Sequence, residues 1–239
     1  MGVLTLVRHG QASYMAEDYD RLSPAGEKQA RRLGEFWAKR GIEFHRVFQG
    51  PAKRHARTAQ IVAEVMSASE TPLPEPVVMK ELDEFDGFQV MKVMVPILIE
   101  RDEAVRRMYE RFQAAQETPE AGRILQRLFG QVARHWSSGE FEIPEVESWA
   151  QFRSRICGAI SHIREVSPRS SNVAVFTSGG PIAAAMSIAL NLPPQQAIEL
   201  VWMSRNCSYS EFLFSGDRFT LSSFNSFPHL DDRELLTYR

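Results

Sequence analysis

Short apolar runs alternate along this chain with longer segments in which apolar residues recur at helical spacing. The first run, residues 3–7, is rich in β-branched residues and stops at Arg8, His9 and Gly10. Runs of this length are typical of buried strands, and a glycine is a common place for one to end. Further runs of this kind lie at residues 47–49, 77–79 and 173–176.

Helix signals lie between these runs. Ser23 and Pro24 predict a helix start, with serine as the N-cap and proline in the first turn, and Gly41 predicts its end. Further helices are expected over residues 50–67, 148–163 and 182–190. This alternation of strands and helices is typical of a three-layer α/β fold, in which a mostly parallel central sheet carries helices on both faces.

Residues 88–146 contain no strand pattern and are strongly helical. Within this segment, Thr118 and Pro119 predict the N-cap and first turn of the last helix, and Gly139 predicts its end. We therefore expect a single domain over residues 1–239, with residues 88–146 as a helical insertion that covers the edge of the sheet where the site lies.

The last part of the chain predicts a hairpin. Residues 207–214 and 219–224 alternate between apolar and polar positions, and Gly216 lies in the turn between them. The tail after Pro228 is polar, and we expect it to fray. Residues 11–23 are polar and irregular, and we expect a loop there.

The charge balance and the spacing of the cysteines argue against several classes of function. With 28 basic and 30 acidic residues among 239, the net charge is −2, which gives no general attraction to nucleic acid or to a membrane surface. Cys157 and Cys207 lack the spacing of a metal site or a disulfide framework, so we expect no metal and a reducing, cytoplasmic location. No apolar stretch has the length needed to span a bilayer. The sequence leaves a homodimer open.

Residues that can carry chemistry follow the predicted strands, at ends that share one edge of a parallel sheet. Arg8 and His9 leave the first strand, and a basic cluster with Arg54, His55 and Arg57 opens the helix after the second. Positive charge at a helix start opposes the helix dipole. The cluster therefore indicates either an anion bound at this helix start or a solvated basic face.

Two more turns should reach the same edge. An acidic stretch that contains Glu84 follows the third strand, and it is either a loop in water or the source of a general acid. Ser178, Gly179 and Gly180 join the late strand to its helix. This junction either is a plain tight turn or exposes backbone N–H groups to a ligand above the sheet.

Six short motifs occur in a fixed order along the chain: Leu4-x-Leu6-Val7-Arg8-His9-Gly10, Leu22-Ser23-x-x-Gly26-x-x-Gln29-Ala30, Gly50-Pro51-x-x-Arg54-x-x-x-Thr58-Ala59, Leu82-x-Glu84 with Gly87, Glu147-Ser148 with Phe152 and Arg155, and Asn225-x-x-Pro228-His229-Leu230. In this order and over nearly the full length, the chain resembles the histidine phosphatase superfamily, the phosphoglycerate-mutase-like proteins. The resemblance implies a phosphoglycerate mutase-like fold.

The resemblance also implies a chemistry that needs no metal and no cofactor. His9 would be the nucleophile that accepts a phosphoryl group, and Glu84 would protonate the leaving oxygen and then activate water. Arg8 and Arg54 would hold phosphoryl oxygens, for which a planar guanidinium group is well suited. The substrate would be a small phosphorylated molecule or phosphate.

One position departs from the family pattern, which carries a second histidine after the late strand. Ser178 stands there, and a serine offers only a neutral donor. Losing one preorganised donor typically costs about 3 kcal/mol, or roughly a hundred- to a thousandfold in rate. Ser178 and the N–H of Gly179 would still hold a phosphate oxygen, and His55 and Arg57 are the candidates for the missing cation.

Three functions fit this sequence. The first hypothesis is a phosphomonoester hydrolase that acts through a phosphohistidine, with reduced activity as one outcome. The second is a catalytically impaired phosphate-binding or scaffold protein of the same fold. The third hypothesis is a phosphoglycerate mutase. We rank it last, because a mutase needs a strongly basic pocket that protects its phosphoenzyme from water, and the mixed charges of residues 101–111 do not supply one.

Overall fold

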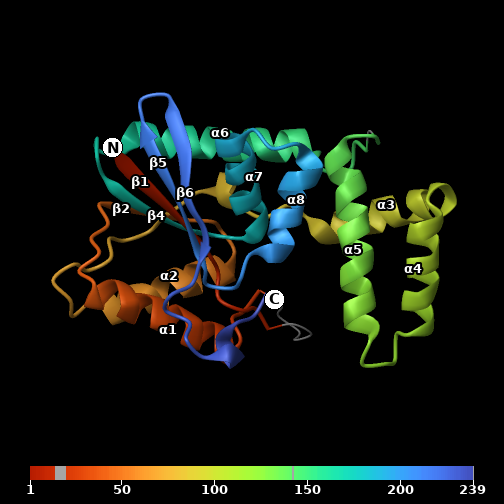
Figure 1. Ribbon diagram of the computed structural model, residues 1–239, viewed down its shortest axis with the longest axis horizontal. Helices are drawn as coiled ribbons and strands as arrows, with labels where there is room; N and C mark the ends of the chain where they lie inside the picture. The colour runs from red at the N-terminus through yellow and green to blue at the C-terminus, as the bar shows by residue number, and fades with distance from the viewer. Residues whose placement is uncertain (14–19, 142, 239) are drawn as a thin grey trace.

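In the computed structural model, which describes residues 1–13, 20–141 and 143–238, one six-stranded sheet has the order β3-β2-β4-β1-β5-β6 (Figure 1). Its strands are β1 (Gly2–Arg8), β2 (Arg46–Gln49), β3 (Val77–Val78), β4 (Asn172–Thr177), β5 (Tyr209–Ser215) and β6 (Arg218–Ser226). The first four strands are parallel, whereas β5 runs antiparallel to β1 and β6 antiparallel to β5. The expected mostly parallel α/β fold is confirmed. Residues 14–19 of the expected loop lie outside the described residues.

Helices cover both faces of this sheet (Figure 1). Helices α1 (Pro24–Lys39) and α2 (Lys53–Met66) pack on one face, and α6 (Trp149–Val166) and α7 (Gly179–Leu190) pack on the other. The predicted cap of α1 is present, since the Ser23 side chain accepts a hydrogen bond from the Gly26 N–H at 3.1 Å.

Strand β4 shows why a continuous apolar run predicts a central strand. Val173 and Val175 point into the core under α6 and α7, whereas Ala174 and Phe176 point into the core under α1 and α2. All four side chains are fully buried. A strand that buries both of its faces has no position left for a polar side chain. Polar groups therefore collect where the strand ends.

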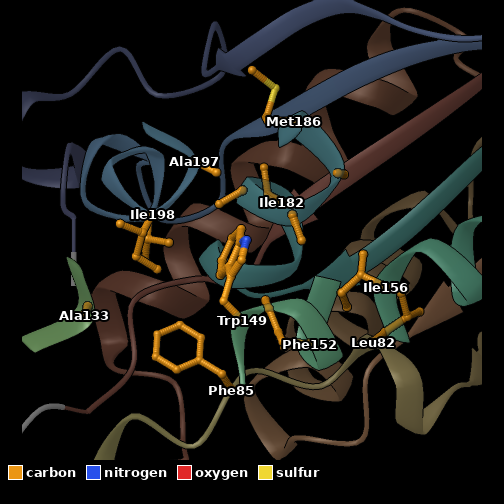
Figure 2. Packing of buried hydrophobic residues seen from close by; sticks show 14 of the residues in the cluster. Leu82, Phe85, Ala133, Trp149, Phe152, Ile156, Ile182, Met186, Ala197 and Ile198 are labelled. Carbon is orange, nitrogen blue, oxygen red and sulfur yellow. The ribbon is translucent and has the colours of Figure 1, made fainter. Parts of the chain in front are cut away.

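The larger core contains a cluster of aromatic rings and joins the helical segment to the sheet (Figure 2). The rings of Phe85 and Trp136 are stacked with centroids 4.5 Å apart, and Phe152 and Trp149 lie against them. Aromatic pairs in this geometry contribute about 0.5–1.5 kcal/mol beyond the area that they bury. Phe85 follows Glu84 directly, so this cluster also fixes the turn that carries that carboxylate.

Residues 87–138 form three helices, α3 (Gly87–Arg101), α4 (Glu103–Ala114) and α5 (Ala121–Ser138). They pack against one another, and α5 also packs against α6 and α8 (Pro194–Met203), beyond the end of the sheet (Figure 1). The described residues include no helix that is long and apolar enough to cross a membrane. The end of α5 at Gly139, in a left-handed conformation, agrees with the sequence.

Four details differ from the sequence expectations. Thr118 is not the N-cap of α5: its hydroxyl donates to the Ala115 carbonyl, and the helix begins two residues later than predicted. Helix α7 begins at Gly179, directly after the strand, rather than at Ile182. Helix α8 had no counterpart in the sequence analysis. The tail also does not fray, because Leu230 and Leu235 are buried.

The C-terminal tail is docked on the body of the protein. Leu230 and Leu235 are buried, and the short helix η2 (Arg233–Leu235) carries the second of them. The Asn206 N–H donates to the Thr237 carbonyl at 2.9 Å. The Gln29 amide donates to the Leu235 carbonyl at 2.8 Å. Two buried leucines and these bonds explain why a mostly polar segment is nonetheless ordered.

Candidate active site

The carboxyl end of β1 fixes the backbone of His9. The His9 N–H donates to the Thr177 carbonyl at 2.9 Å, and the His9 carbonyl accepts from the Cys207 N–H at 3.1 Å. The imidazole Nδ1 lies 2.7 Å from the Gly10 carbonyl. Because a carbonyl only accepts, this contact places the proton of a neutral ring on Nδ1 and leaves Nε2 with an unshared electron pair.

Arg8 precedes this histidine and is buried, with 8% of the residue exposed. Its guanidinium Nη1 donates to the Ser204 carbonyl, which ends helix α8. The C-terminal end of a helix carries partial negative charge, so it is a favourable partner for a buried cation. A helix absent from the sequence analysis therefore positions one of the predicted phosphate-binding residues.

Arg54, in the first turn of α2, reaches the same place. Its Nη2 donates to the Ser178 hydroxyl at 3.3 Å, and its Nη1 forms an ion pair with Asp20 at 2.7 Å. The Asp20 carboxylate also accepts from the Lys53 N–H at 2.8 Å. The sequence left open an anion at this helix start or a solvated basic face, and in the structure the Asp20 carboxylate lies at this helix start.

The two candidates for the missing cation lie in different environments. The His55 side chain is fully buried, and its Nε2 lies 2.6 Å from the Ser178 hydroxyl. Arg57 instead pairs with Glu27 at 2.9 Å and with Glu64 at 3.6 Å, on the partly exposed surface of α1 and α2. Among the expected auxiliary residues, the structure brings His55 to Ser178 and directs the described ion pairs of Arg57 elsewhere.

The turn from β4 into α7 brings Glu84 into the group. The Gly180 N–H, at the start of α7, donates to the Glu84 carboxylate at 3.0 Å. A Cβ at position 180 would lie 1.9 Å from the other carboxylate oxygen, so only glycine permits this approach. Ser178 and Gly179 form the first part of the same turn, with Gly179 as the first residue of the helix.

Burial and positive charge set the protonation states of this site. Burial is the main cause that lowers the pKa of His9 well below its usual value, and the charges of Arg54 and Arg8 act in the same direction. Burial raises the pKa of Glu84, against the opposing effects of the Gly180 N–H and the same two arginines. A neutral imidazole and a protonated carboxyl group are the forms that a nucleophile and a proton donor require.

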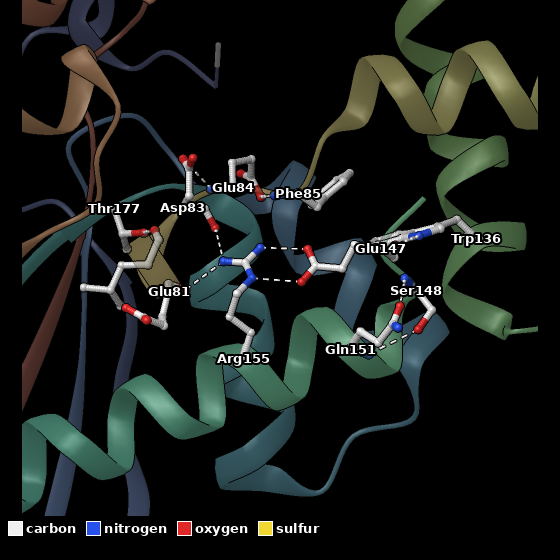
Figure 3. Close-up of polar contacts among 11 residues, drawn as sticks. Glu81, Asp83, Glu84, Phe85, Trp136, Glu147, Ser148, Gln151, Arg155 and Thr177 are labelled. Atoms are coloured by element: carbon white, nitrogen blue, oxygen red, sulfur yellow. Dashed lines mark hydrogen bonds and ion pairs between the residues drawn. The ribbon is translucent and has the colours of Figure 1, made fainter. Parts of the chain in front are cut away.

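Arg155 holds the turn that carries Glu84 (Figure 3). Its Nη1 donates to the carbonyls of Glu81 and Asp83, at 2.7 and 3.0 Å. Its Nε and Nη2 donate to the two oxygens of Glu147, each at 2.8 Å. Arg155 appeared in the sequence analysis only as part of a motif, and nothing local in the sequence indicates that it spans these two segments.

Three further residues of the site were not predicted. Thr58 accepts a hydrogen bond from the Gly10 N–H at 3.1 Å, Asp20 pairs with Arg54, and the Ser204 carbonyl accepts from Arg8. Thr58 belongs to the same motif as Arg54, so the sequence could have indicated its place in the site. Asp20 and the Ser204 carbonyl act through contacts between distant segments, which spacing along the chain does not reveal.

A groove of about 460 Å³ lies outside this buried site, between α5 and α8. We call it the arginine groove, because Arg123, Arg127 and Arg134 line it along α5. Glu199 on α8 also lines the groove and pairs with Arg134 at 2.5 Å. The groove is therefore cationic and open to solvent, with one of its three guanidinium groups already paired.

Comparison with known proteins identifies related sequences and folds. The sequence profile of the histidine phosphatase superfamily (branch 1) matches residues 4–128 and 107–226. A 2,3-bisphosphoglycerate-dependent phosphoglycerate mutase from Caulobacter vibrioides is 36% identical over 80 residues, which are 30% of this chain and 33% of that protein. The match therefore spans about a third of the length of this curated relative.

Solved structures match over almost the whole chain. YhfR of Bacillus stearothermophilus has a TM-score of 0.67 at 16% identity and covers 97% of this chain and 100% of its own. A mycobacterial glucosyl-3-phosphoglycerate phosphatase has a TM-score of 0.60 at 20% identity, with 94% and 98% covered. At these identities the likeness shows a shared fold.

Proposed function

Because this chain belongs to the histidine phosphatase superfamily (branch 1), we propose that it is a phosphomonoester hydrolase acting through a phosphohistidine at His9. The observation that carries the proposal is the Nδ1 contact with Gly10, which supports a neutral His9 with an unshared electron pair on Nε2, the form that a nucleophile requires. The substrate class is a small phosphorylated molecule, and the reaction needs neither metal nor cofactor.

In the first step, Arg8 and Arg54 hold the non-bridging oxygens of the phosphoryl group, together with Ser178 and the N–H of Gly179. Nε2 of His9 attacks phosphorus, and the bond from phosphorus to the ester oxygen breaks. The electron pair of that bond leaves on the ester oxygen, which takes a proton from a neighbouring acid. The guanidinium groups oppose the charge that develops on the equatorial oxygens.

Glu84 is the acid in this proposal. Burial is the main cause that raises its pKa, and a raised pKa favours the protonated carboxyl group that can give its proton to the leaving oxygen. In the second step the resulting carboxylate takes a proton from water, the water oxygen attacks phosphorus, and the bond from phosphorus to Nε2 breaks with its electron pair returning to His9. Inorganic phosphate leaves, and both side chains return to their starting protonation states.

The proposed location of the protein is the cytoplasm, and the state of its two cysteines supports this proposal. Cys157 and Cys207 are both free thiols in the structure. Free cysteines are the usual state in a reducing compartment.

A trapping experiment tests the proposal. The protein is incubated with an aryl phosphate and quenched in alkali, and the phosphorylated residue is identified by mass spectrometry. We expect turnover together with an acid-labile phosphoenzyme at His9, and neither in His9→Ala. Phosphate binding without turnover would favour the scaffold hypothesis, and isomerisation of phosphoglycerate would favour a mutase.

A further inference from the structure

The buried part of the site contains a second imidazole, which the proposed reaction does not use. The rings of His9 and His55 have centroids 5.7 Å apart. His55 lies behind Ser178, with its Nε2 2.6 Å from the Ser178 hydroxyl oxygen. The relative exposures of His55 and Ser178 are 0% and 1%, so water cannot replace this hydrogen bond. The two side chains therefore act as one unit.

The backbone at the end of β2 makes room for this ring. A Cβ at Gly50 would lie 2.4 Å from Nδ1 of His55, which is closer than any real contact. The same Cβ would lie 2.8 Å from the Leu82 carbonyl oxygen, so both the His55 ring and the Leu82 backbone require glycine at position 50. The His55 ring on α2 is therefore closely packed between the Gly50 backbone, directly after β2, and the Ser178 hydroxyl before α7.

The electrostatic surroundings of His55 change when an anion binds. Burial first, and then the charge of Arg54, lower the pKa of His55 well below its usual value, whereas a contact with the Gly50 backbone acts in the opposite direction. The ring is therefore neutral without a ligand. A dianion held by Arg54 and Arg8 would offset the charge of these two groups and favour the imidazolium form.

The protonated ring would change what Ser178 offers to a ligand. With protons on both nitrogens, Nε2 donates to the Ser178 oxygen, and the hydroxyl proton is then available to an oxygen of the bound anion. Hydrogen bonds that involve a charged donor are roughly twice as strong as neutral ones. The imidazolium group of His55, bonded to the Ser178 hydroxyl, therefore supplies part of the positive charge that a serine alone does not provide.

We infer that His55 is a positioning residue that acts on a bound phosphoryl group through the hydroxyl of Ser178, and that it takes up one proton when a tetrahedral dianion binds. The proton comes from solvent, and no bond of the anion is made or broken. Among the described residues, the other charged and titratable groups around this pocket are Arg54 on the same helix with its partner Asp20, Arg8 and His9 at the end of β1, and Glu84 beside α7. The inference rests on the proposed function only in its choice of ligand class.

Proton uptake is measured directly by calorimetry. Tungstate, which remains a dianion near neutral pH, is titrated into the protein in buffers with different ionisation enthalpies. We expect a net uptake of protons by the wild-type protein and by His9→Gln, but none by His55→Gln. We also expect His55→Gln to bind tungstate about tenfold more weakly. Uptake that persists in His55→Gln, or that disappears in His9→Gln, overturns the inference.

A second set of variants changes both His55 and Ser178, so that a loss of binding can be told apart from a failure to fold. Ser178→His alone puts a second ring into the space of His55, and His55→Ala alone removes the imidazole. Both single variants should bind tungstate at least tenfold more weakly. The double variant His55→Ala/Ser178→His supplies one imidazole from the other side of the same space, and we expect it to recover binding and proton uptake.

A double variant that folds, as shown by its thermal transition, but binds no better than either single variant overturns the inference. Because binding and proton uptake need no turnover, these results stay interpretable if the protein hydrolyses no phosphoester. Failure of the proposed function and failure of this inference are therefore distinguishable.

Discussion

The buried site and the arginine groove are both rich in arginine, but they are built in opposite ways. Arg54 in the site has a side chain that is 14% exposed and has partners on two segments distant from its own helix. Arg134 in the groove is 51% exposed and pairs with one carboxylate on a neighbouring helix. The difference is one of preorganisation. Charges fixed in a buried place can stabilise a transition state, whereas exposed charges are screened by water and salt.

The largest expected difference between the two regions concerns the nucleophile. His9→Ala removes the atom that forms the phosphoenzyme, so we expect kcat for an aryl phosphate to fall by roughly four orders of magnitude or more. Arg123→Ala in the groove should change kcat by less than about threefold, because exposed charges contribute little. Steady-state kinetics with both variants checks the contrast. A comparable loss in the groove variant would contradict it.

The second prediction compares two arginines directly. Arg54→Lys keeps the charge but loses the planar fork that can contact Ser178 and a phosphoryl oxygen together, so we expect kcat/KM to fall roughly a hundred- to a thousandfold. Arg127→Lys in the groove is the matched control, with an expected change of less than about threefold. If both replacements are equally mild, then the buried site is not preorganised in the way described.

A variant of Arg155 tests whether the contacts that hold the turn of Glu84 matter as much as the residues that touch the substrate. Arg155→Met removes the donors to Glu81 and Asp83 and leaves Glu147 without its partner, so the turn that carries Glu84 can shift. A shift of about 1 Å can lower the rate by up to roughly a hundredfold. We expect a tenfold to hundredfold loss of kcat, with KM and the affinity for tungstate within about twofold. If the variant loses anion binding as well as kcat, then the substitution disturbs the whole site, and the prediction of a local shift is wrong.

The pH dependence of the rate should reflect the same burial. Glu84 acts as an acid and its pKa is raised, so kcat should decrease by about tenfold per pH unit once the pH exceeds that raised value. His9 must be neutral, and its pKa lies below the usual 6.5, so the loss on the acid side should begin well below that pH. A pH–rate profile of Glu84→Gln should be low and lack the alkaline limb. An unchanged alkaline limb would assign it to another group.

The smallest effect is expected on the surface of the insertion. Glu103 pairs with Arg106 and Arg107 one turn further along α4, and all three side chains are about half exposed or more. Exposed pairs of this kind contribute less than about 1 kcal/mol. Glu103→Gln should therefore lower the free energy of unfolding by less than that amount and leave kcat unchanged. Urea denaturation together with the kinetic assay checks both parts, and a loss of activity would contradict the comparison.

The same contrast explains how much the sequence could predict. The cap at Ser23, the buried run of β4 and the hairpin turn at Gly216 depend on a few neighbouring residues, and all three were predicted. Thr118 was a wrong prediction, because its hydroxyl satisfies the carbonyl of the preceding turn instead of starting a helix. Local signals of this kind compete, and the sequence does not show which one prevails.

For the site, the sequence named the residues but not their contacts. Arg8, His9, Arg54 and Glu84 were expected at one sheet edge, and the structure brings them together; their catalytic roles stay predictions. The pairing of Asp20 with Arg54 could not be predicted, because it joins a loop to a helix start 34 positions away. The docking of the tail depends in the same way on surfaces that form only in the folded chain.

The position of β1 has a consequence for how the protein is made. Among the strands of the sheet, β1 is synthesised first, yet its two neighbours, β4 and β5, come after β2, β3 and the helices α1 to α6. At translation rates of about 5–20 residues per second, the nascent strand waits roughly 10 s or more for either partner. During that time its backbone edges are unpaired and open to association with other chains. We expect ribosome-bound chains that end before β4 to depend on chaperones, since the strand that precedes His9 cannot pair in the sheet until β4 has been synthesised.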